Sequence, residues 1–306
     1  MSTPRIVFAG TPEFALASLT ALVDAGDSVV AVYTQPDRPA GRGRRVTASP
    51  VKRFAEEHGI AVLQPSSFRG EATVAEFAAL QPDVLIVAAY GLILPQNVLD
   101  IPTHGCLNVH ASVLPRWRGA APIQAAIISA DETTGVSLMR MTAGLDCGPV
   151  FSASVTAIEK DESAGELHDR LAALGGELLL KDLSKILRGD ISPVQQDEAL
   201  VTYAGKIQKQ DAELDWSLSA DELQRRIRAY IPVPGAFFFA GNEVRVKVWQ
   251  ASVVTGIDAL PGTFVQYDAE GIVIACGRDG LQLASLQLPG KRRAPAHEFV
   301  AQIDLR

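Results

Sequence analysis

The residues best suited to chemistry lie in Cys106–Ile123, which reads CLNVHASVLPRWRGAAPI. This stretch begins as an apolar strand and carries Asn108 and His110 two residues apart. Side chains alternate along a strand, so these two side chains share one face. A carboxamide beside an imidazole can hold a carbonyl group and exchange a proton with it. Open α/β sheets bind ligands where their strands end, so we expect a candidate site after His110.

The loop that follows this strand adds to the expectation. The strand should break at Ser112 and Pro115, where a basic and aromatic RWR segment begins, and Gly119–Pro122 then opens a helix. A single Asn or His at a strand end is most often structural. Because two such residues share one face and such a loop follows them, a catalytic role is as plausible here as a structural one.

A third polar side chain lies in a glycine-rich turn. The turn Thr142–Pro149 follows a strand predicted at Gly135–Met141, and it holds Asp146 between Gly144 and Gly148. Glycine allows a backbone to approach a ligand closely. An Asp in such a turn is most often a turn former, so both interpretations stay open from the residues alone.

The elements that must position these side chains are typical of an α/β domain. Ile6–Ala9 and Val29–Tyr33 are predicted strands with a helical pattern between them. Strand, helix and strand within about 30 residues indicate a βαβ unit and a parallel sheet. Asp83–Ala89 (DVLIVAA) is a third, continuous apolar strand, and its end should lie close to the end of the strand that carries Asn108.

The first turn of the chain, Gly10-Thr11-Pro12, resembles the start of a nucleotide-binding unit only in part. Thr11 is predicted as the N-cap and Pro12 as the first residue of a helix that ends near Gly26. The sequence GTPEF lacks the second and third glycines of GxGxxG. This argues against a dinucleotide site.

A basic segment follows the second strand. Gln35–Pro50 has three prolines and two glycines in sixteen residues and is predicted to be a long loop. The cations between Asp37 and Arg53 are Arg38, Arg42, Arg44, Arg45, Lys52 and Arg53. A local patch of this kind can contact phosphates even though the whole chain has a net charge of −7. The alternative is a solvated charged loop.

The second half of the chain changes character after a linker. Ser163 and Glu166 have capping-box spacing and open a helix that ends at Gly189, and Asp190–Gly205 then lacks a sustained period. A second capping box, Ser219 with Glu222, opens a short helix. Five short strands with Gly and Pro turns suggest a small β-barrel. They are predicted at Ala236–Phe239, Val244–Ala251, Gly262–Val265, Ile272–Ala275 and Leu281–Leu288, and a closing helix follows Lys291–Arg293.

Length and composition exclude several protein classes. With 306 residues, 47% hydrophobic and 21% charged, the chain reads as a soluble globular protein of roughly two domains. The apolar run after Arg5 is too short for a secretory signal, and no window approaches the ~18 apolar residues of a membrane span. Cys106, Cys147 and Cys276 form no CxxC pair, which favours neither a disulfide framework nor a zinc site. We expect a monomeric cytoplasmic protein without membrane partners.

Motifs along nearly the whole chain resemble one family. They are FAGTPEFA, TQPDRPAGRGRR, AAYGLILP, NVHASVLP, GLDCGP, YAGKIQKQDAELDW and LQLPGKRR. The sequence is similar to the methionyl-tRNA formyltransferases. NVHASVLP and the GLD turn alone would indicate the wider group that uses 10-formyltetrahydrofolate. The PDRPAGRGRR loop and the linked C-terminal domain make the resemblance specific to the member of this group that acts on tRNA.

The resemblance implies a fold and a domain plan. The fold is a doubly wound, Rossmann-like parallel-sheet N-terminal domain plus a small OB-like β-barrel C-terminal domain. Residues 1–189 would form the formyl-folate-binding catalytic domain, residues 190–205 the linker, and residues 206–306 the tRNA-binding domain. The implied activity is transfer of a formyl group from 10-formyltetrahydrofolate, a co-substrate, to the α-amino group of methionyl-initiator tRNA in translation initiation, without a metal.

The resemblance also implies roles for particular residues. Asn108 and His110 would stabilise a tetrahedral oxyanion, with His110 placed to move a proton, and Asp146 would orient His110 or accept the proton of the amine. The implied folate-binding residues are Ala89, Tyr90, Leu92, Ser112, Val113, Leu114 and Pro115. The implied tRNA-binding residues are Arg38, Arg42, Arg44, Arg45, Lys206 and Lys209.

The sequence departs from the family pattern at three places. Cys147 stands where the family usually has Thr, Tyr230–Gly235 lacks the usual Asn and Trp, and Gln210 replaces a common acid. Two alternatives stay open. One is another formyl-folate enzyme, either a transferase that acts on a small substrate or a hydrolase, against which the arginine-rich loop argues. The other is a non-enzymatic RNA-binding module, against which the three candidate catalytic residues argue.

Overall fold

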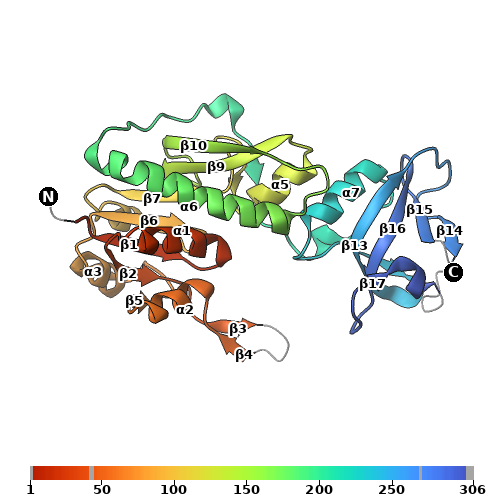
Figure 1. The fold of residues 1–306 in the computed structure, drawn as a ribbon, viewed down its shortest axis with the longest axis horizontal. Coiled ribbons are helices and arrows are strands. Elements are labelled where there is room, and N and C mark those ends of the chain that lie inside the picture. Colours follow the sequence, from red (N-terminus) through yellow and green to blue (C-terminus); the bar gives the residue numbers. More distant parts are fainter. Residues whose placement is uncertain (1–2, 41–44, 269–270, 301–306) are drawn as a thin grey trace. The chain divides into compact units, whose positions relative to one another are not determined.

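Two compact units make up the chain. The computed structural model describes residues 3–40, 45–268 and 271–300, and Figure 1 shows its elements in chain order. The N-terminal unit comprises Met1–Pro122, Thr133–Thr156 and His168–Ala204. The C-terminal unit comprises Ile123–Glu132, Ala157–Leu167 and Gly205–Arg306. Each unit is described separately below.

The N-terminal unit is built on a seven-stranded sheet in the order β10-β9-β7-β6-β1-β2-β5. Its strands are β1 (Ile6–Gly10), β2 (Val29–Tyr33), β5 (Ala61–Leu63), β6 (Val84–Ala88), β7 (Cys106–His110), β9 (Thr133–Arg140) and β10 (Val150–Ala157). The helices of this unit are α1 (Glu13–Asp24), α2 (Pro50–Glu57), α3 (Glu71–Ala79), α4 (Gln96–Leu99) and, from His168 onward, α6 (Ala164–Arg188). Helix α5 (Pro122–Ile128) belongs to the C-terminal unit from Ile123 onward. Strands β1, β6 and β7 are buried throughout, as expected for continuous apolar strands with both faces covered.

Strand pairing makes this a doubly wound sheet. The pairs β1–β2, β2–β5, β1–β6 and β6–β7 are all parallel, whereas β7–β9 is antiparallel. The chain runs outward from β1 to β2 and β5, then returns to β6 on the other side of β1. The carboxyl ends of β1, β6 and β7 therefore meet at one edge, the edge where open α/β sheets bind ligands. The predicted doubly wound N-terminal domain is confirmed.

The two faces of the sheet are covered differently. A Cβ added to Gly175 of α6 would meet the Val109 side chain at 2.8 Å, so α6 packs closely on the face to which Val109 points. Alternation then places Asn108 and His110 on the opposite face. Cys106, with the same parity, lies in a hydrophobic cluster with residues of α3 and α4. Asn108 and His110 thus lie on the same face of β7 as Cys106, which belongs to this hydrophobic core.

The helix starts of this unit show one side-chain cap and correct one predicted cap. Ser49 accepts a hydrogen bond from the Lys52 N–H at 3.0 Å and caps α2. Pro12, not Thr11, occupies the N-cap position of α1, and no side chain caps it. The Thr11 hydroxyl instead donates to the carbonyl of Tyr90 at 3.2 Å, so it ties the β1 turn to the end of β6. The predicted Thr11 cap was wrong because the Thr11 hydroxyl binds the Tyr90 carbonyl instead of an N–H at the start of α1.

Two short strands form in the basic segment after β2. Strand β3 (Arg38–Ala40) pairs antiparallel with β4 (Arg45–Thr47), where a long loop had been predicted. Pro39 is tolerated because a two-stranded ribbon has edge positions that need no donor N–H. The ion pair between Lys52 Nζ and Asp37 Oδ2, at 2.7 Å, removes one cation from the patch.

The segment predicted as a linker packs on the N-terminal unit. Val194 forms an antiparallel bridge with Val150, and a 3₁₀ turn, η1, covers Glu198–Leu200. Strand β11 (Tyr203–Ala204) then pairs in parallel with β8 (Arg118–Gly119), directly after the β7 loop. Up to Ala204, this segment therefore belongs to the fold that surrounds the candidate site.

The C-terminal unit is built on an antiparallel half-barrel. Its strands follow the order β12-β13-β16-β15-β14, with β17 paired to β16. The elements are η2 (Gln210–Ala212), α7 (Ala220–Ala229), β12 (Phe237–Ala240), η3 (Gly241–Glu243), β13 (Val244–Val254), β14 (Phe264–Asp268), β15 (Gly271–Ala275), β16 (Gly280–Gln287), β17 (Ala294–Pro295) and η4 (Ala296–Phe299). The predicted small β-domain is confirmed. The predicted closing helix is only the 3₁₀ turn η4 within the described residues.

Candidate active site

The candidate site begins at the carboxyl end of β7. Asn108 and His110 are 9% and 6% exposed, so little of either side chain reaches solvent. They lie opposite Met139 and Ser137 of β9 in the antiparallel register. Among the described residues, no hydrogen bond engages the Asn108 side chain. Its amide is therefore free to bind a ligand at the rim of the sheet.

The His110 ring is held between a carbonyl and a carboxylate. Its Nε2 lies 3.0 Å from the carbonyl oxygen of Trp117. A carbonyl oxygen can only accept, so Nε2 carries the proton and donates it to this bond. The other ring nitrogen, Nδ1, lies 3.7 Å from Asp146 Oδ2. Nδ1 can therefore take up a proton beside a negative charge.

Asp146 is held by the loop that it faces. Its Oδ2 accepts the Gly119 N–H at 2.9 Å, while its backbone has a positive φ of 46°. Gly119 itself has a φ of 121°, and a Cβ added there would lie 2.5 Å from the Ala204 carbonyl oxygen. Only glycine tolerates both this backbone conformation and this short distance. Gly119 therefore allows β11 to approach closely while its own N–H donates to Asp146.

A hydroxyl pair fixes the loop between β7 and β8. The Ser112 hydroxyl donates to the Arg116 carbonyl at 2.6 Å. Ser137 of β9 accepts the Leu114 N–H at 3.0 Å and donates to the Ser112 carbonyl at 2.8 Å. Ser112 and Ser137 are fully buried, so water does not compete for these bonds. The loop is consequently a fixed part of the site.

This arrangement can stabilise an oxyanion and move a proton at one place. A carboxamide and an imidazole share one face of β7, and a carboxylate lies beside the imidazole, and these are the groups that such chemistry needs. Within the described residues, no group of three or more His, Cys, Asp or Glu side chains could hold a metal ion. No helix of the described part is long and apolar enough to cross a membrane.

Two family models match this chain. Residues 4–183 match the family model described as formyl transferase. Residues 206–303 match the model of the formyl transferase C-terminal domain. The chain belongs to the formyl transferase family.

Similar proteins extend the match over nearly the whole chain. A methionyl-tRNA formyltransferase of Marinobacter nauticus is 50% identical over 297 residues, which cover 97% of this chain and 95% of that protein. A methionyl-tRNA formyltransferase of Burkholderia multivorans is 51% identical over 309 residues, covering 98% of this chain and 94% of the relative. Both domains of this formyl transferase are therefore present in these relatives in the same order.

Solved structures show the same fold at much lower identity. WlaRD, a sugar 3N-formyl transferase crystallised with dTDP and 5-N-formyl-THF, has a TM-score of 0.69 at 15% identity, covering 95% of this chain and all of that one. HypX from Aquifex aeolicus, crystallised with tetrahydrofolic acid, has a TM-score of 0.66 at 17% identity, covering 98% of this chain. This chain spans only 47% of the HypX chain.

The residues expected to bind folate lie at two strand ends of this formyl transferase. Ala89 follows β6, is exposed and has a positive φ of 44°, while Leu92 is half-buried. Tyr90 is 2% exposed, and its ring packs against Phe68 in the core. Only the backbone of Tyr90 is thus positioned toward the edge, where its carbonyl accepts from Gln35 Nε2 at 3.0 Å.

The second expected folate group, Ser112–Pro115, follows β7. Val113 and Pro115 are half-buried, whereas Leu114 is 8% exposed. The Ser112 hydroxyl is already bonded to Arg116. In this loop the groups that are not fully buried or already bonded are therefore the apolar side chains of Val113 and Pro115 and parts of the backbone.

The residues expected to bind tRNA are only partly described. Arg38 in β3 is exposed, as are Lys206 and Lys209 in the C-terminal unit. Arg42, Arg44 and the side chain of Arg45 lie outside the described residues. The structure therefore places three of the six expected cations in solvent.

A further basic and aromatic face lies on β13 of the C-terminal unit. Arg245, Lys247 and Trp249 alternate along this strand and share its outer face. The Arg245 guanidinium lies 3.7 Å from the centroid of the Phe237 ring, and that of Arg293 lies 5.4 Å from the Trp249 ring. Sequence reasoning noted Arg293 but missed the strand residues, although the alternation RVKVW was the available signal.

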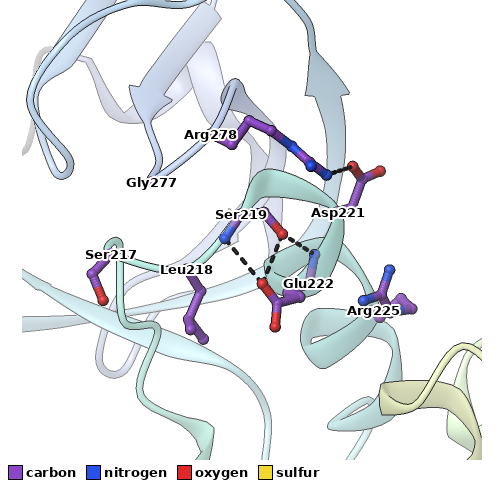
Figure 2. Close-up of a pocket in the computed structure, with 8 residues that line it drawn as sticks. All are labelled: Ser217, Leu218, Ser219, Asp221, Glu222, Arg225, Gly277 and Arg278. Atoms are coloured by element: carbon purple, nitrogen blue, oxygen red, sulfur yellow. Dashed lines mark hydrogen bonds and ion pairs between the residues drawn. The ribbon is translucent and has the colours of Figure 1, made fainter.

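Figure 2 shows a surface depression at the start of α7, whose polar groups are already engaged. Ser219 and Glu222 form a complete capping box. Hydrogen bonds from Ser219 hold the pKa of the Glu222 carboxyl below its ordinary value. Asp221 pairs with Arg278 at 3.3 Å. The depression thus reflects how this helix begins and offers no free catalytic group.

Proposed function

We propose that this protein transfers a formyl group from 10-formyltetrahydrofolate to the α-amino group of methionyl-initiator tRNA. The observation that carries the proposal is the match, at about half identity over 97% of the chain, to proteins named methionyl-tRNA formyltransferase. A match of this extent includes both the catalytic unit and the C-terminal domain. The geometry at the end of β7 supports the chemical part of the proposal.

Asn108 would stabilise the developing oxyanion. When an amine attacks the formyl carbon, the carbonyl oxygen gains negative charge, and a preorganised N–H donor stabilises that charge more than the neutral carbonyl. The Asn108 amide is nearly buried, so solvent screens it little. Its position on the face shared with His110 lets both residues meet the same reacting group.

His110 and Asp146 would carry the proton between the two nitrogens. A bond forms between the amine nitrogen and the formyl carbon, and the bond from that carbon to N10 of the folate breaks. The amine loses one proton and N10 gains one, so the exchange balances. With Nε2 bonded to Trp117, the Nδ1 atom of His110 is the nitrogen available for this transfer, and Asp146 stabilises the resulting imidazolium.

The folate would bind to the N-terminal unit, whereas the tRNA would contact residues of both units. The folate would lie against the backbone near Ala89 and the Ser112–Pro115 loop, and the C-terminal domain, residues 206–306, would contact tRNA. Cations beside aromatic rings on an open sheet face suit RNA, because bases stack on rings while cations neutralise phosphates. The face defined by Arg245, Lys247 and Trp249 has both features and supports this assignment.

Activity is the direct test, and Asn108 is the sharpest variant for it. The full chain is incubated with 10-formyltetrahydrofolate and charged initiator tRNA, and N-formylated methionine is measured. We expect Asn108→Ala to lower kcat by about 10²- to 10³-fold, as loss of one oxyanion donor does elsewhere. Folate binding should change little. Wild-type turnover in Asn108→Ala would refute the oxyanion role.

The arginine-rich segment separates a tRNA substrate from a small amine. We expect the triple replacement of Arg42, Arg44 and Arg45 by Ala to weaken tRNA binding and to flatten the plot of log K against log salt. The slope should fall by about one unit for each lost phosphate contact. Folate affinity is the internal control. An unchanged tRNA KM with an unchanged salt slope would instead assign this segment to solvated surface.

A further inference from the structure

The chain returns to the candidate site after α6. We use the name strap for Gln196–Ala204, which lies along the loop Pro115–Ala120. Tyr203 and Ala204 pair in parallel with β8, and the Ala120 N–H donates to the Ala204 carbonyl at 2.8 Å. The strap therefore has a regular backbone ladder that sets its register against this loop.

One strap side chain holds the Asp146 turn. Gln196 is half-buried, and its Nε2 donates to the carbonyls of Asp146 and Gly148, at 2.8 and 2.7 Å. The amide has two N–H groups, so both bonds form at once. Asp146 has a left-handed backbone, which residues with a side chain adopt at a cost unless their surroundings enforce it. Gln196 supplies that constraint.

A second strap side chain holds the partner of His110. The Thr202 hydroxyl accepts the Trp117 N–H at 2.9 Å. Trp117 also has a positive φ, 62°, and its carbonyl receives the His110 Nε2–H. The Thr202 carbonyl also accepts the Arg118 N–H, at 2.9 Å, so Thr202 holds both peptide groups that flank Trp117.

We propose that Gln196 and Thr202 are positioning residues for formyl transfer, acting through Asp146 and His110. The inference rests on the proposed function, because it assigns the strap a role in the same reaction. Neither side chain touches the atoms that would react. Their loss should therefore lower kcat much more than it changes the affinity for either substrate.

The Thr202 pair tests one half of the proposal with a minimal change. Thr202→Val keeps the shape but removes the oxygen that accepts the Trp117 N–H, whereas Thr202→Ser keeps that oxygen. We expect Thr202→Val to lower kcat by about 10- to 100-fold, because small misplacements of catalytic groups have effects of this order. Thr202→Ser should recover most of the wild-type kcat.

The Gln196 variant tests the other half. Gln196 Oε1 accepts from Arg118 Nε at 2.9 Å, and Gln196→Glu keeps this acceptor while removing both donors to the Asp146 turn. Glu198→Gln is the matched control. Glu198 binds the same arginine at 2.8 Å but is 73% exposed and does not contact the turn. We expect a loss of kcat for Gln196→Glu only.

Active sites are counted by folate titration, so kcat refers to folded enzyme only. Wild-type protein that does not formylate charged tRNA would refute the proposed function itself. If wild-type protein is active, the inference is overturned by a wild-type kcat in both Thr202→Val and Gln196→Glu. It is also overturned if folate affinity falls in parallel with kcat, or if Thr202→Ser is as impaired as Thr202→Val.

Discussion

Replacing Asp146 by Asn removes one negative charge from the candidate site and almost nothing else. In Asp146→Asn, the side-chain oxygen of the new amide could still accept the Gly119 N–H, which now donates to Oδ2 at 2.9 Å. The Gln196 bonds go to the backbone carbonyls of the turn, so the substitution leaves them in place. The atom that faces His110 Nδ1 would then be a neutral amide oxygen, which stabilises a proton on Nδ1 far less than a carboxylate oxygen does.

The expected size of the effect follows from the geometry. Oδ2 of Asp146 and Nδ1 of His110 are 3.7 Å apart, and their side chains are 18% and 7% exposed. At this separation, opposite unit charges attract by about 4 kcal/mol for an effective dielectric constant near 20. That attraction exists only while the imidazole carries the proton. Its loss should lower kcat by about 10³-fold.

Single-turnover formylation of charged tRNA, with folate binding measured separately, would isolate the chemical step. Asp100→Asn is the matched control, because Asp100 is an exposed carboxylate bonded to Gln96 at the end of α4. We expect normal rates for that control and unchanged folate affinity for both variants.

A kcat for Asp146→Asn within tenfold of the wild-type value would refute the charge argument. Asp146 would then serve only to shape the turn, as most Asp residues in such turns do. A large loss of folate affinity would also contradict the reasoning, because the charge would then act on substrate binding instead of on proton transfer.

Two predictions concern other parts of the chain. Burial raises the pKa of Cys106 to about 12 and that of Cys276 to about 11. A thiol reagent at pH 8 should therefore modify only the half-buried Cys147 in the native protein. Peptide mapping that finds modified Cys106 would contradict this expectation. Ser219→Ala should destabilise the C-terminal unit by about 1 kcal/mol, measured by denaturant unfolding. Because the hydrogen bonds from Ser219 lower the pKa of Glu222, the difference should be complete at neutral pH and shrink as the pH falls below about 4; a constant difference down to pH 2 would contradict the capping box.

Local signals were sufficient for most elements of the fold. Strand β2 was predicted with its observed bounds, Val29–Tyr33, and the predicted strand Ile6–Ala9 differs from β1 by one residue at its end. Both capping boxes form as their spacing indicates. These features depend on neighbours within a few residues, where hydrophobic period and cap chemistry act directly.

Signals that depend on distant partners were missed or wrong. The Thr11 hydroxyl binds the Tyr90 carbonyl, 79 residues away, instead of capping its own helix. Residues 190–204 have no sustained period, yet they form part of the N-terminal unit. A chain cut after Gly189 would lose Gln196 and Thr202, so we expect a fragment that ends at Ala204 to be the better test of the isolated unit.

The sequence by itself determined the classes of element and the identity of the polar groups. Alternation along Cys106–His110 placed Asn108 and His110 on one face, because the side-chain period of a strand leaves no other choice. The tertiary structure decided which atoms meet. It brings Asp146 to His110 and to Gly119, and it brings the strap across both, because contacts between segments far apart in the chain depend on sheet order and loop packing that no local pattern encodes.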